Sequence, residues 1–171
     1  TPGKVIELVR EGVFTGKCKT INQGKVVATA FGGGREDLEF VQMNPTFELH
    51  SVVYVNDPRT IAAHDNMVAI NNALSIDLTG QITAESIGPR MLGGTGGQLS
   101  FATGAAYSKG GRCVTLLPST ARGGTVSRIV AMFEPGTAIT VPRSLADFVI
   151  TEYGIASLRG KTQRQRAEEM I

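Results

Sequence analysis

The sequence predicts an α/β fold in which helices flank an open mixed sheet. Short apolar runs typical of buried strands recur along the chain, and helix-compatible stretches separate them. The strand-like runs are residues 25–31, 68–71, 113–117 and 148–151. The helical stretches are residues 4–12, 35–43, 99–107 and 162–171. Because strands this apolar offer little polar surface to water, we expect a sheet that is covered on both faces.

Local sequence patterns add the remaining elements. Thr79 and Gly80 lie between residues 74–78 and 81–86, which predicts an antiparallel hairpin. Thr162 is the expected N-cap of the last helix. The further predictions are an extended segment at 47–55, a turn at 56–59 with side chains bonded to the backbone, and strand-like segments at 125–133 and 138–141.

The composition indicates one domain, or one domain with a small annex. With 42% hydrophobic and 19% charged residues, the 171-residue chain can bury a core. Its net charge of +2 is too small to indicate a nucleic-acid surface. Cys18 and Cys113 form no motif, so we expect neither disulfides nor a Cys-bound metal, and a cytoplasmic location fits. No apolar run is long enough to span a bilayer and no secretory signal is visible, so we expect no membrane partner.

The histidines and the chain ends support two further expectations. His50 and His64 are isolated and lack carboxylates at ligand spacing, so we expect no metal site. The chain begins at Thr1 without a methionine and stops at Ile171 within a charged helical pattern. We therefore expect it to be a piece of a longer polypeptide.

A glycine-rich loop at residues 91–98 is the most informative local feature. Its four glycines, followed by Gln98, leave the backbone N–H groups free to converge on a carbonyl oxygen, an oxyanion or a phosphate. A helical stretch follows, and its N-terminus would also favour negative charge. The spacing matches neither G-x-x-x-x-G-K-[ST] nor G-x-G-x-x-G. From the glycines alone, a tight turn between two buried elements explains the loop equally well.

Other polar residues offer weaker chemistry. Ser108, Ser119 and Ser127 lie near turns, but no G-x-S-x-G nucleophile motif is present. Glu152 follows an apolar strand, where we favour an ion pair with Arg159 or another basic residue over a catalytic role. We expect the helix face that carries four charged residues to be simply solvated. Those residues are Arg164, Arg166, Glu168 and Glu169.

Two asparagines and one arginine fit an anion-binding pocket. Asn56 and Asn71 both follow apolar segments, and an amide NH₂ together with a glycine N–H can hold a carbonyl oxygen that becomes an oxyanion. Arg122, before Gly123 and Gly124, suits a phosphate contact, although a solvated turn arginine is the simpler interpretation. The residues thus indicate an oxyanion-type pocket that lacks a nucleophile.

Six motifs in this order resemble the C-terminal half of the acetyl-CoA hydrolase/transferase family, from about Gly3 onward. They are NMVAINNAL at 66–74, DLTGQ at 77–81, GTGGQ at 94–98, LPST at 117–120, GTVSRI at 124–129, and VITEYGIA at 149–156 with LRG at 158–160. As a set these motifs are highly specific. The resemblance implies an open α/β fold of the CoA-transferase type, with residues 1–171 forming the C-terminal domain of a two-half protein. Residues 1–50 are a candidate for part of a small linking subdomain.

The resemblance also implies a chemistry and its residues. CoA passes between an acyl-CoA and a short-chain carboxylate through a glutamyl-CoA thioester. By position, Asn56 and Gly97 are the oxyanion donors, and Asn71 lines the CoA channel. The other implied CoA contacts are Gly94, Gly96, Gly97, Gln98 and Arg122, the phosphate role of Arg122 being an extrapolation. The expected partners are the N-terminal half of the polypeptide and further copies in a homo-oligomer, and the isolated chain should be inactive.

Two departures from the family pattern leave alternatives open. The nucleophilic glutamate of the family lies a few residues before Thr1, so no glutamate here takes that role. Ser100 stands where many relatives have an acidic residue, which bears on the hydrogen bonds of the loop and on acyl preference. Acyl-CoA hydrolysis needs the same pocket, and exclusion of water separates it from transfer. A non-catalytic CoA-binding or assembly domain is the alternative of another class, and a sugar-phosphate isomerase of similar architecture is a weaker one.

Overall fold

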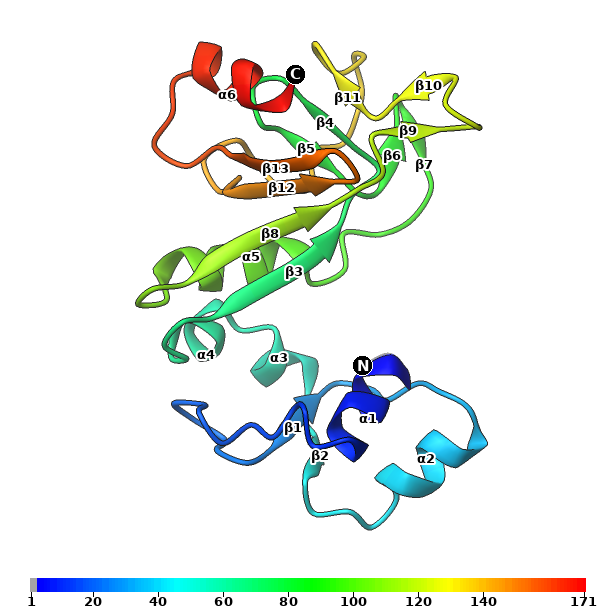
Figure 1. The fold of residues 1–171 in the computed structure, drawn as a ribbon, viewed down its shortest axis with the longest axis vertical. Coiled ribbons are helices and arrows are strands. Elements are labelled where there is room, and N and C mark those ends of the chain that lie inside the picture. The colour runs from blue at the N-terminus through cyan, green and yellow to red at the C-terminus, as the bar shows by residue number, and fades with distance from the viewer. Residues whose placement is uncertain (1–2) are drawn as a thin grey trace.

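The computed structural model describes residues 3–171 and has two parts (Figure 1). The N-terminal lobe comprises residues 3–55 and the main body residues 58–171. Both contain helices and short strands, which confirms the predicted α/β class. Thr1 and Pro2 lie outside the described residues, and the assignment of residues 1–50 to a linking subdomain stays a prediction.

A four-stranded mixed sheet organises the main body. Its order is β13-β12-β8-β3, formed by Gly154–Ser157, Phe148–Thr151, Arg112–Leu116 and Val68–Asn72. Strands β3, β8 and β12 are parallel, and β13 pairs antiparallel with β12. The connection from β3 to β8 contains several short strands at residues 75–91 and then helix α5 (Gln98–Tyr107), which gives it the length that a parallel pair requires. The three parallel strands are those predicted from the apolar runs, whereas β13 was not predicted.

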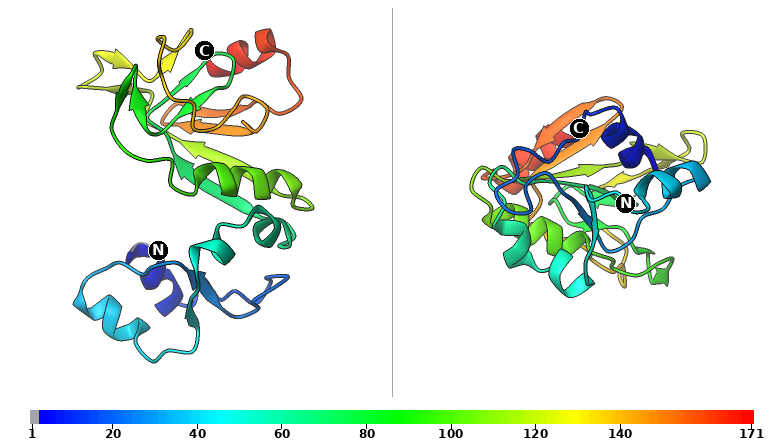
Figure 2. Two further views of the ribbon diagram at one scale, coloured as in Figure 1. Left: turned by 180° about the vertical axis from the view of Figure 1, so that it is seen from behind. Right: turned by 90° about the horizontal axis from the view of Figure 1, so that it is seen from below.

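The two faces of this sheet are unequal. Helix α5 lies across one face of β3 and β8, behind them in Figure 1 and in front of them in the left view of Figure 2. The side chains on that face are buried and join Ala102 and Ala105 of α5 in one core cluster. They are Ala69, Cys113, Val149 and Ala156, and the buried Thr115 lies on the same face outside that cluster. On the other face Ile70 is 63% and Ile155 67% exposed. The expectation of a sheet covered on both faces is therefore wrong for the described residues.

A second, smaller sheet completes the core. Its order is β11-β4-β5, formed by Ile129–Val130, Ser75–Asp77 and Ile82–Thr83. The predicted hairpin around Gly80 is confirmed by the antiparallel pairing of β4 and β5. Buried Asp77 holds its turn, because its Oδ1 accepts hydrogen bonds from the Thr79 amide and hydroxyl and from the Gln81 amide. The strand-like segment at 138–141 forms only an isolated bridge between Val141 and Ile82.

Short ladders and a capped helix surround these sheets. Strands β6 (Ser86–Ile87) and β7 (Arg90–Met91) form one antiparallel pair, and β9 (Thr120–Ala121) and β10 (Val126–Ser127) form another. Helix α6 (Gln163–Met170) begins with the predicted cap, since Thr162 Oγ1 accepts from the Gln165 amide. Among residues 3–171, every helix is too short or too polar to cross a lipid bilayer.

The N-terminal lobe packs around a small aromatic cluster. It holds α1 (Gly3–Arg10), α2 (Arg35–Val41) and a parallel pair of β1 (Val26–Ala28) and β2 (Phe47–Leu49). Phe47 makes edge contacts with Phe31 and Phe40. The extended segment expected at 47–55 ends early, because the Ser51 hydroxyl accepts from the Val53 amide and begins helix α3 (Val52–Val55).

Candidate active site

The glycine-rich loop ends, as predicted, at a helix N-terminus. Gly97 is the N-cap of α5, and no side chain caps the helix there. Gly93, Gly94 and Gly96 have no other part of the chain within 4 Å of where a Cβ would lie, and the backbone of Gly94 and Gly96 is open to a ligand. The loop is anchored at its start by the Glu85 carbonyl, which accepts from the Leu92 and Gly93 amides.

Asn56 and Gly97, 41 positions apart in the sequence, are brought together. A Cβ at position 97 would lie 2.7 Å from Asn56 Nδ2 and 3.5 Å from Phe101 Cδ2. The Asn56 amide therefore reaches the start of α5 only because position 97 has no side chain. An amide donor beside the backbone at a helix N-terminus is an arrangement that stabilises a developing oxyanion.

Helix packing produces this approach. Asp57 caps α4 (Pro58–Ala62) by accepting from the Arg59 amide at 2.9 Å, as expected for the turn at 56–59. Helix α4 packs closely against α5, since a Cβ on Gly104 would lie 2.5 Å from the Ile61 Cβ. With α4 fixed against α5, Asn56 at the end of α3 faces the loop before α5.

Two further predicted residues carry buried amide nitrogens that have no hydrogen-bond partner within residues 3–171. They are Asn71 Nδ2, near the end of β3, and Gln98 Nε2, at the start of α5, where Gln98 is only 7% exposed. Because α5 runs back across two parallel strands, its N-terminus lies near their carboxyl ends, where α/β proteins place ligand sites. A buried donor left unpaired costs about 1–3 kcal/mol, so both amides are suited to a ligand that supplies acceptors.

Arg122 lies on a separate element from these residues. It is exposed on the β9–β10 hairpin and has a positive φ of 50°. Figure 1 places that hairpin beside β6 and β7, away from α3 and α4. Its assignment as a CoA contact stays a prediction.

Glu152 has a partner different from the one expected. Its carboxylate accepts from the Ser119 amide at 2.9 Å and from the Ser119 hydroxyl at 2.6 Å, while Arg159 donates to the Ala106 carbonyl. The hydrogen bond from the Ser119 side chain lowers the pKa of the Glu152 carboxyl. The preferred ion pair with Arg159 is therefore wrong. Neighbouring strands β8 and β12 bring these residues together, which their sequence separation does not reveal.

The charged face of α6 is only partly a solvated surface. Arg164 and Glu168 form an exposed i,i+4 pair, as expected. Arg166, however, is partly buried and donates through Nη1 to the carbonyls of Thr79 and Arg143. It thereby ties α6 to the β4–β5 turn.

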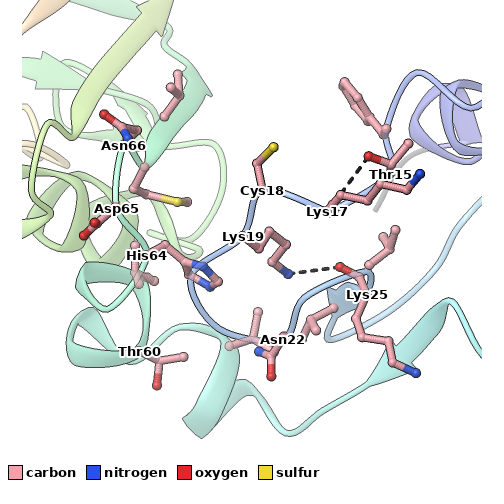
Figure 3. A pocket seen from close by; sticks show the side chains of 18 of the residues that line it. Thr15, Lys17, Cys18, Lys19, Asn22, Lys25, Thr60, His64, Asp65 and Asn66 are labelled. Carbon is pink, nitrogen blue, oxygen red and sulfur yellow. Dashed lines mark hydrogen bonds between the residues drawn. The ribbon is translucent and has the colours of Figure 1, made fainter.

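A cavity of about 790 Å³ lies between the N-terminal lobe and the main body (Figure 3). Sequence reasoning missed it, because its walls come from separate segments. Val5 of α1 and residues 13–19 form one side, and Val55 and Phe101 belong to the other. Phe101 also lies against the position of Gly97, and Val55 directly precedes Asn56, so the cavity is adjacent to the Asn56–Gly97 pair although neither residue of the pair lines it. Ligand sites commonly have this size and occur where two parts of a protein meet.

The histidines do not form a metal site with their neighbours. His50 Nε2 lies 3.0 Å from Glu48 Oε2, and His64 lines the cavity. Across residues 3–171, no group of three or more potential His, Cys, Asp or Glu ligands is assembled.

Comparison with known proteins identifies the class. Residues 33–171 match the model of the acetyl-CoA hydrolase/transferase C-terminal domain. The chain belongs to this family, which confirms the resemblance seen in its motifs. It is 47% identical over 167 residues to the 4-hydroxybutyrate coenzyme A transferase of Clostridium kluyveri, an alignment that covers 98% of this chain and 39% of that protein. It is 42% identical over 167 residues to the succinyl-CoA:cyclohexane-1-carboxylate CoA transferase of Geobacter metallireducens, an alignment that covers 98% of this chain and 38% of that protein.

Solved structures agree with this family assignment. RipA from Yersinia pestis superposes with a TM-score of 0.92 at 39% identity, covering 99% of this chain and 38% of RipA. The 4-hydroxybutyrate CoA-transferase of Porphyromonas gingivalis superposes with a TM-score of 0.83 at 40% identity, covering 99% of this chain and 39% of that one. A citrate lyase α subunit from Streptococcus mutans shares the fold, with a TM-score of 0.67 at 17% identity. The chain thus spans about two-fifths of the length of its curated relatives.

Proposed function

We propose that the polypeptide carrying this chain transfers CoA between an acyl-CoA and a short-chain carboxylate, and that this domain supplies the oxyanion donors. One observation carries the proposal: the Asn56 amide lies against the Gly97 backbone at the start of α5, in a chain of the acetyl-CoA hydrolase/transferase family. The five relatives with 36–47% identity carry CoA-transferase names.

The proposed route is covalent and uses a glutamate upstream of Thr1. Its carboxylate attacks the thioester carbonyl, and the thiolate of CoA leaves to give a mixed anhydride. The thiolate then attacks the glutamyl carbonyl and expels the first carboxylate, leaving a glutamyl-CoA thioester. The acceptor carboxylate attacks this thioester and displaces the CoA thiolate, which gives a second mixed anhydride. The thiolate then attacks the acyl carbonyl of that anhydride. The products are the new acyl-CoA and the free glutamate.

The Asn56 amide and the Gly97 N–H act at the tetrahedral stages. Each attack places negative charge on a former carbonyl oxygen, and donors fixed in advance stabilise that charge without reorganising. The unpartnered amide nitrogens of Asn71 and Gln98 would donate hydrogen bonds to acceptor groups of the bound acyl-CoA near the same helix end. Gly94 and Gly96 offer open backbone to the same ligand.

Hydrolysis is the second candidate. An acetyl-CoA hydrolase of Candida glabrata is a more distant relative, 30% identical over 124 residues. In that case water, rather than a second carboxylate, would attack the acyl-enzyme. Cytoplasmic location, a homo-oligomeric state and inactivity of the isolated chain also stay predictions.

The test uses the complete polypeptide with butyryl-CoA and isotopically labelled acetate. Formation of labelled acetyl-CoA without release of free thiol supports transfer. Thiol release that does not depend on acetate supports hydrolysis instead. CoA binding without either reaction would leave only the binding-domain alternative.

A further inference from the structure

The inter-lobe cavity contains a cation that no carboxylate neutralises. Lys19 is partly buried, and the one hydrogen bond of its ammonium goes to the Lys25 carbonyl at 3.0 Å. Among residues 3–171, no acidic side chain forms an ion pair with it. Glu48, which influences Lys19 through space, is already paired with Lys25 and His50. A partly buried ammonium without a counter-ion is costly, and it still has two N–H donors to offer.

His64 faces the same part of the cavity. Figure 3 shows its ring directed toward the loop that carries Lys19, whereas the Asp65 carboxylate points away. The imidazole makes no hydrogen bond to a described residue. Burial lowers the pKa of His64, and the nearby Lys19 charge lowers it further. Burial also lowers the pKa of Lys19. The charge of Glu48 raises the pKa of Lys19 without offsetting the effect of burial.

The rest of the cavity is largely apolar. Its walls include Val5, Val13, Phe14, Val55 and Phe101. A volume of about 790 Å³ is far more than a short-chain carboxylate needs, and it falls in the range of sites for drug-sized ligands. An elongated ligand with an apolar arm and an anionic end matches both the walls and the cation.

We propose that Lys19, assisted by His64, binds a phosphate group of CoA at the end of the inter-lobe cavity remote from the reacting thioester. This inference rests on the proposed function for the identity of the ligand. A phosphate oxygen would accept from the Lys19 ammonium, and neutral His64 can donate one ring N–H to the same group. Val55 and Phe101 line the cavity and are next to Asn56 and Gly97, so the proposed ligand would extend from the cavity past these two residues to the Asn56–Gly97 pair.

The experiment measures CoA binding to the complete polypeptide by calorimetry, without turnover. Hydrogen bonds to charged groups contribute about 1.5–3 kcal/mol, so we expect Lys19→Met to weaken CoA binding about 10- to 100-fold. The affinity for pantetheine, which has no phosphate, should stay unchanged. Lys19→Arg should keep most of the affinity for CoA, which separates loss of charge from loss of folding. Lys4→Met, at an exposed position of the same lobe outside the cavity wall, is the matched control and should change binding less than twofold.

Two ligands then sharpen the assignment. If the 3′-phosphate is the partner of Lys19, the wild type should bind 3′-dephospho-CoA more weakly than CoA, and Lys19→Met should bind the two ligands equally well. If the diphosphate is the partner, Lys19→Met should weaken the binding of both ligands. The proposal would be overturned if Lys19→Met lost equal affinity for CoA and pantetheine, or if its CoA affinity were unchanged. It would also be overturned if the rest of the polypeptide filled the cavity. Normal CoA binding without transfer would instead count against the proposed function alone.

Discussion

The two faces of the four-stranded sheet differ in both side-chain size and surroundings. The face under α5 carries small residues such as Ala69 and Ala156, which let the helix approach closely. The opposite face carries Ile70 and Ile155, which are large, apolar and exposed. Large apolar side chains usually lie inside, so this sheet is unusual in burying small residues on one face while large ones such as Ile70 and Ile155 stay uncovered on the other. Because its relatives are more than twice as long, we expect further polypeptide to cover the open face.

The covered face also positions the candidate site. Close packing of α4 on α5 depends on Gly104, and it brings Asn56 to Gly97. The open face lacks such a helix among residues 3–171 and positions nothing comparable. The comparison therefore predicts large effects for changes near α5 and small effects on the open face.

The largest expected effect is on catalysis at the start of α5. Gly97→Ala would place a Cβ 2.7 Å from Asn56 Nδ2 and push the two donors apart. Loss of one oxyanion donor costs about 2.7–4 kcal/mol, so we expect kcat of the complete polypeptide to fall about 10²- to 10³-fold, with CoA affinity much less affected. Gly93→Ala, where a Cβ meets open space, is the control. Equal losses of kcat and of affinity would contradict the donor role of Gly97.

A smaller effect is expected on the packing of α4 against α5. A Cβ at position 104 would lie 2.5 Å from Ile61 and 3.1 Å from the Pro58 carbonyl, so Gly104→Ala overpacks the contact. We expect the free energy of unfolding of the chain to fall by about 1–3 kcal/mol in urea titrations. No loss would mean that α4 can move away from α5 at little cost.

The next prediction compares the two faces directly. Val149 is 2% exposed on the covered face, so Val149→Ala should lower the free energy of unfolding by about 2 kcal/mol. Ile70→Ala removes more atoms but from an exposed position, and should change it by less than about 0.5 kcal/mol. Urea unfolding of both variants measures the two losses of stability. A larger loss for Ile70→Ala than for Val149→Ala would contradict the assignment of a covered and an open face.

The smallest effect concerns pH. The hydrogen bonds from Ser119 hold the pKa of Glu152 below its ordinary value of 4.5. Its contribution to stability is therefore present above the unfolded-state pKa and is lost as pH falls through the lower folded-state pKa. Glu152→Gln should lower Tm slightly at pH 7, and the difference from the wild type should vanish in strongly acidic buffer. A difference that grows on acidification would contradict this sign.

Sequence reasoning succeeded where structure is determined locally. The apolar runs located β3, β8 and β12, and Thr162 marked the start of α6. It failed at α3, because the valines after Ser51 favour a strand while the Ser51 hydroxyl starts a helix.

The contacts that define the site are long-range, and spacing does not reveal them. Family motifs, rather than periodicity, brought Asn56 and Gly97 into one hypothesis. The Ser119–Glu152 contact and the hydrogen bonds made by Arg166 Nη1 join segments that are 23 to 87 positions apart. Nothing local distinguishes Lys19 from a solvated lysine, since its surroundings come from α1, α3 and α5.

The most direct test of the central claim is trapping of the covalent intermediate. The complete polypeptide would be incubated with acetyl-CoA, treated with borohydride and analysed by peptide mass spectrometry. The account predicts reduction at one glutamate upstream of Thr1, and much slower accumulation in Asn56→Ala and Gly97→Ala than in Gly93→Ala. Absence of any reduced glutamate while CoA still binds, or equal accumulation in all variants, would contradict it.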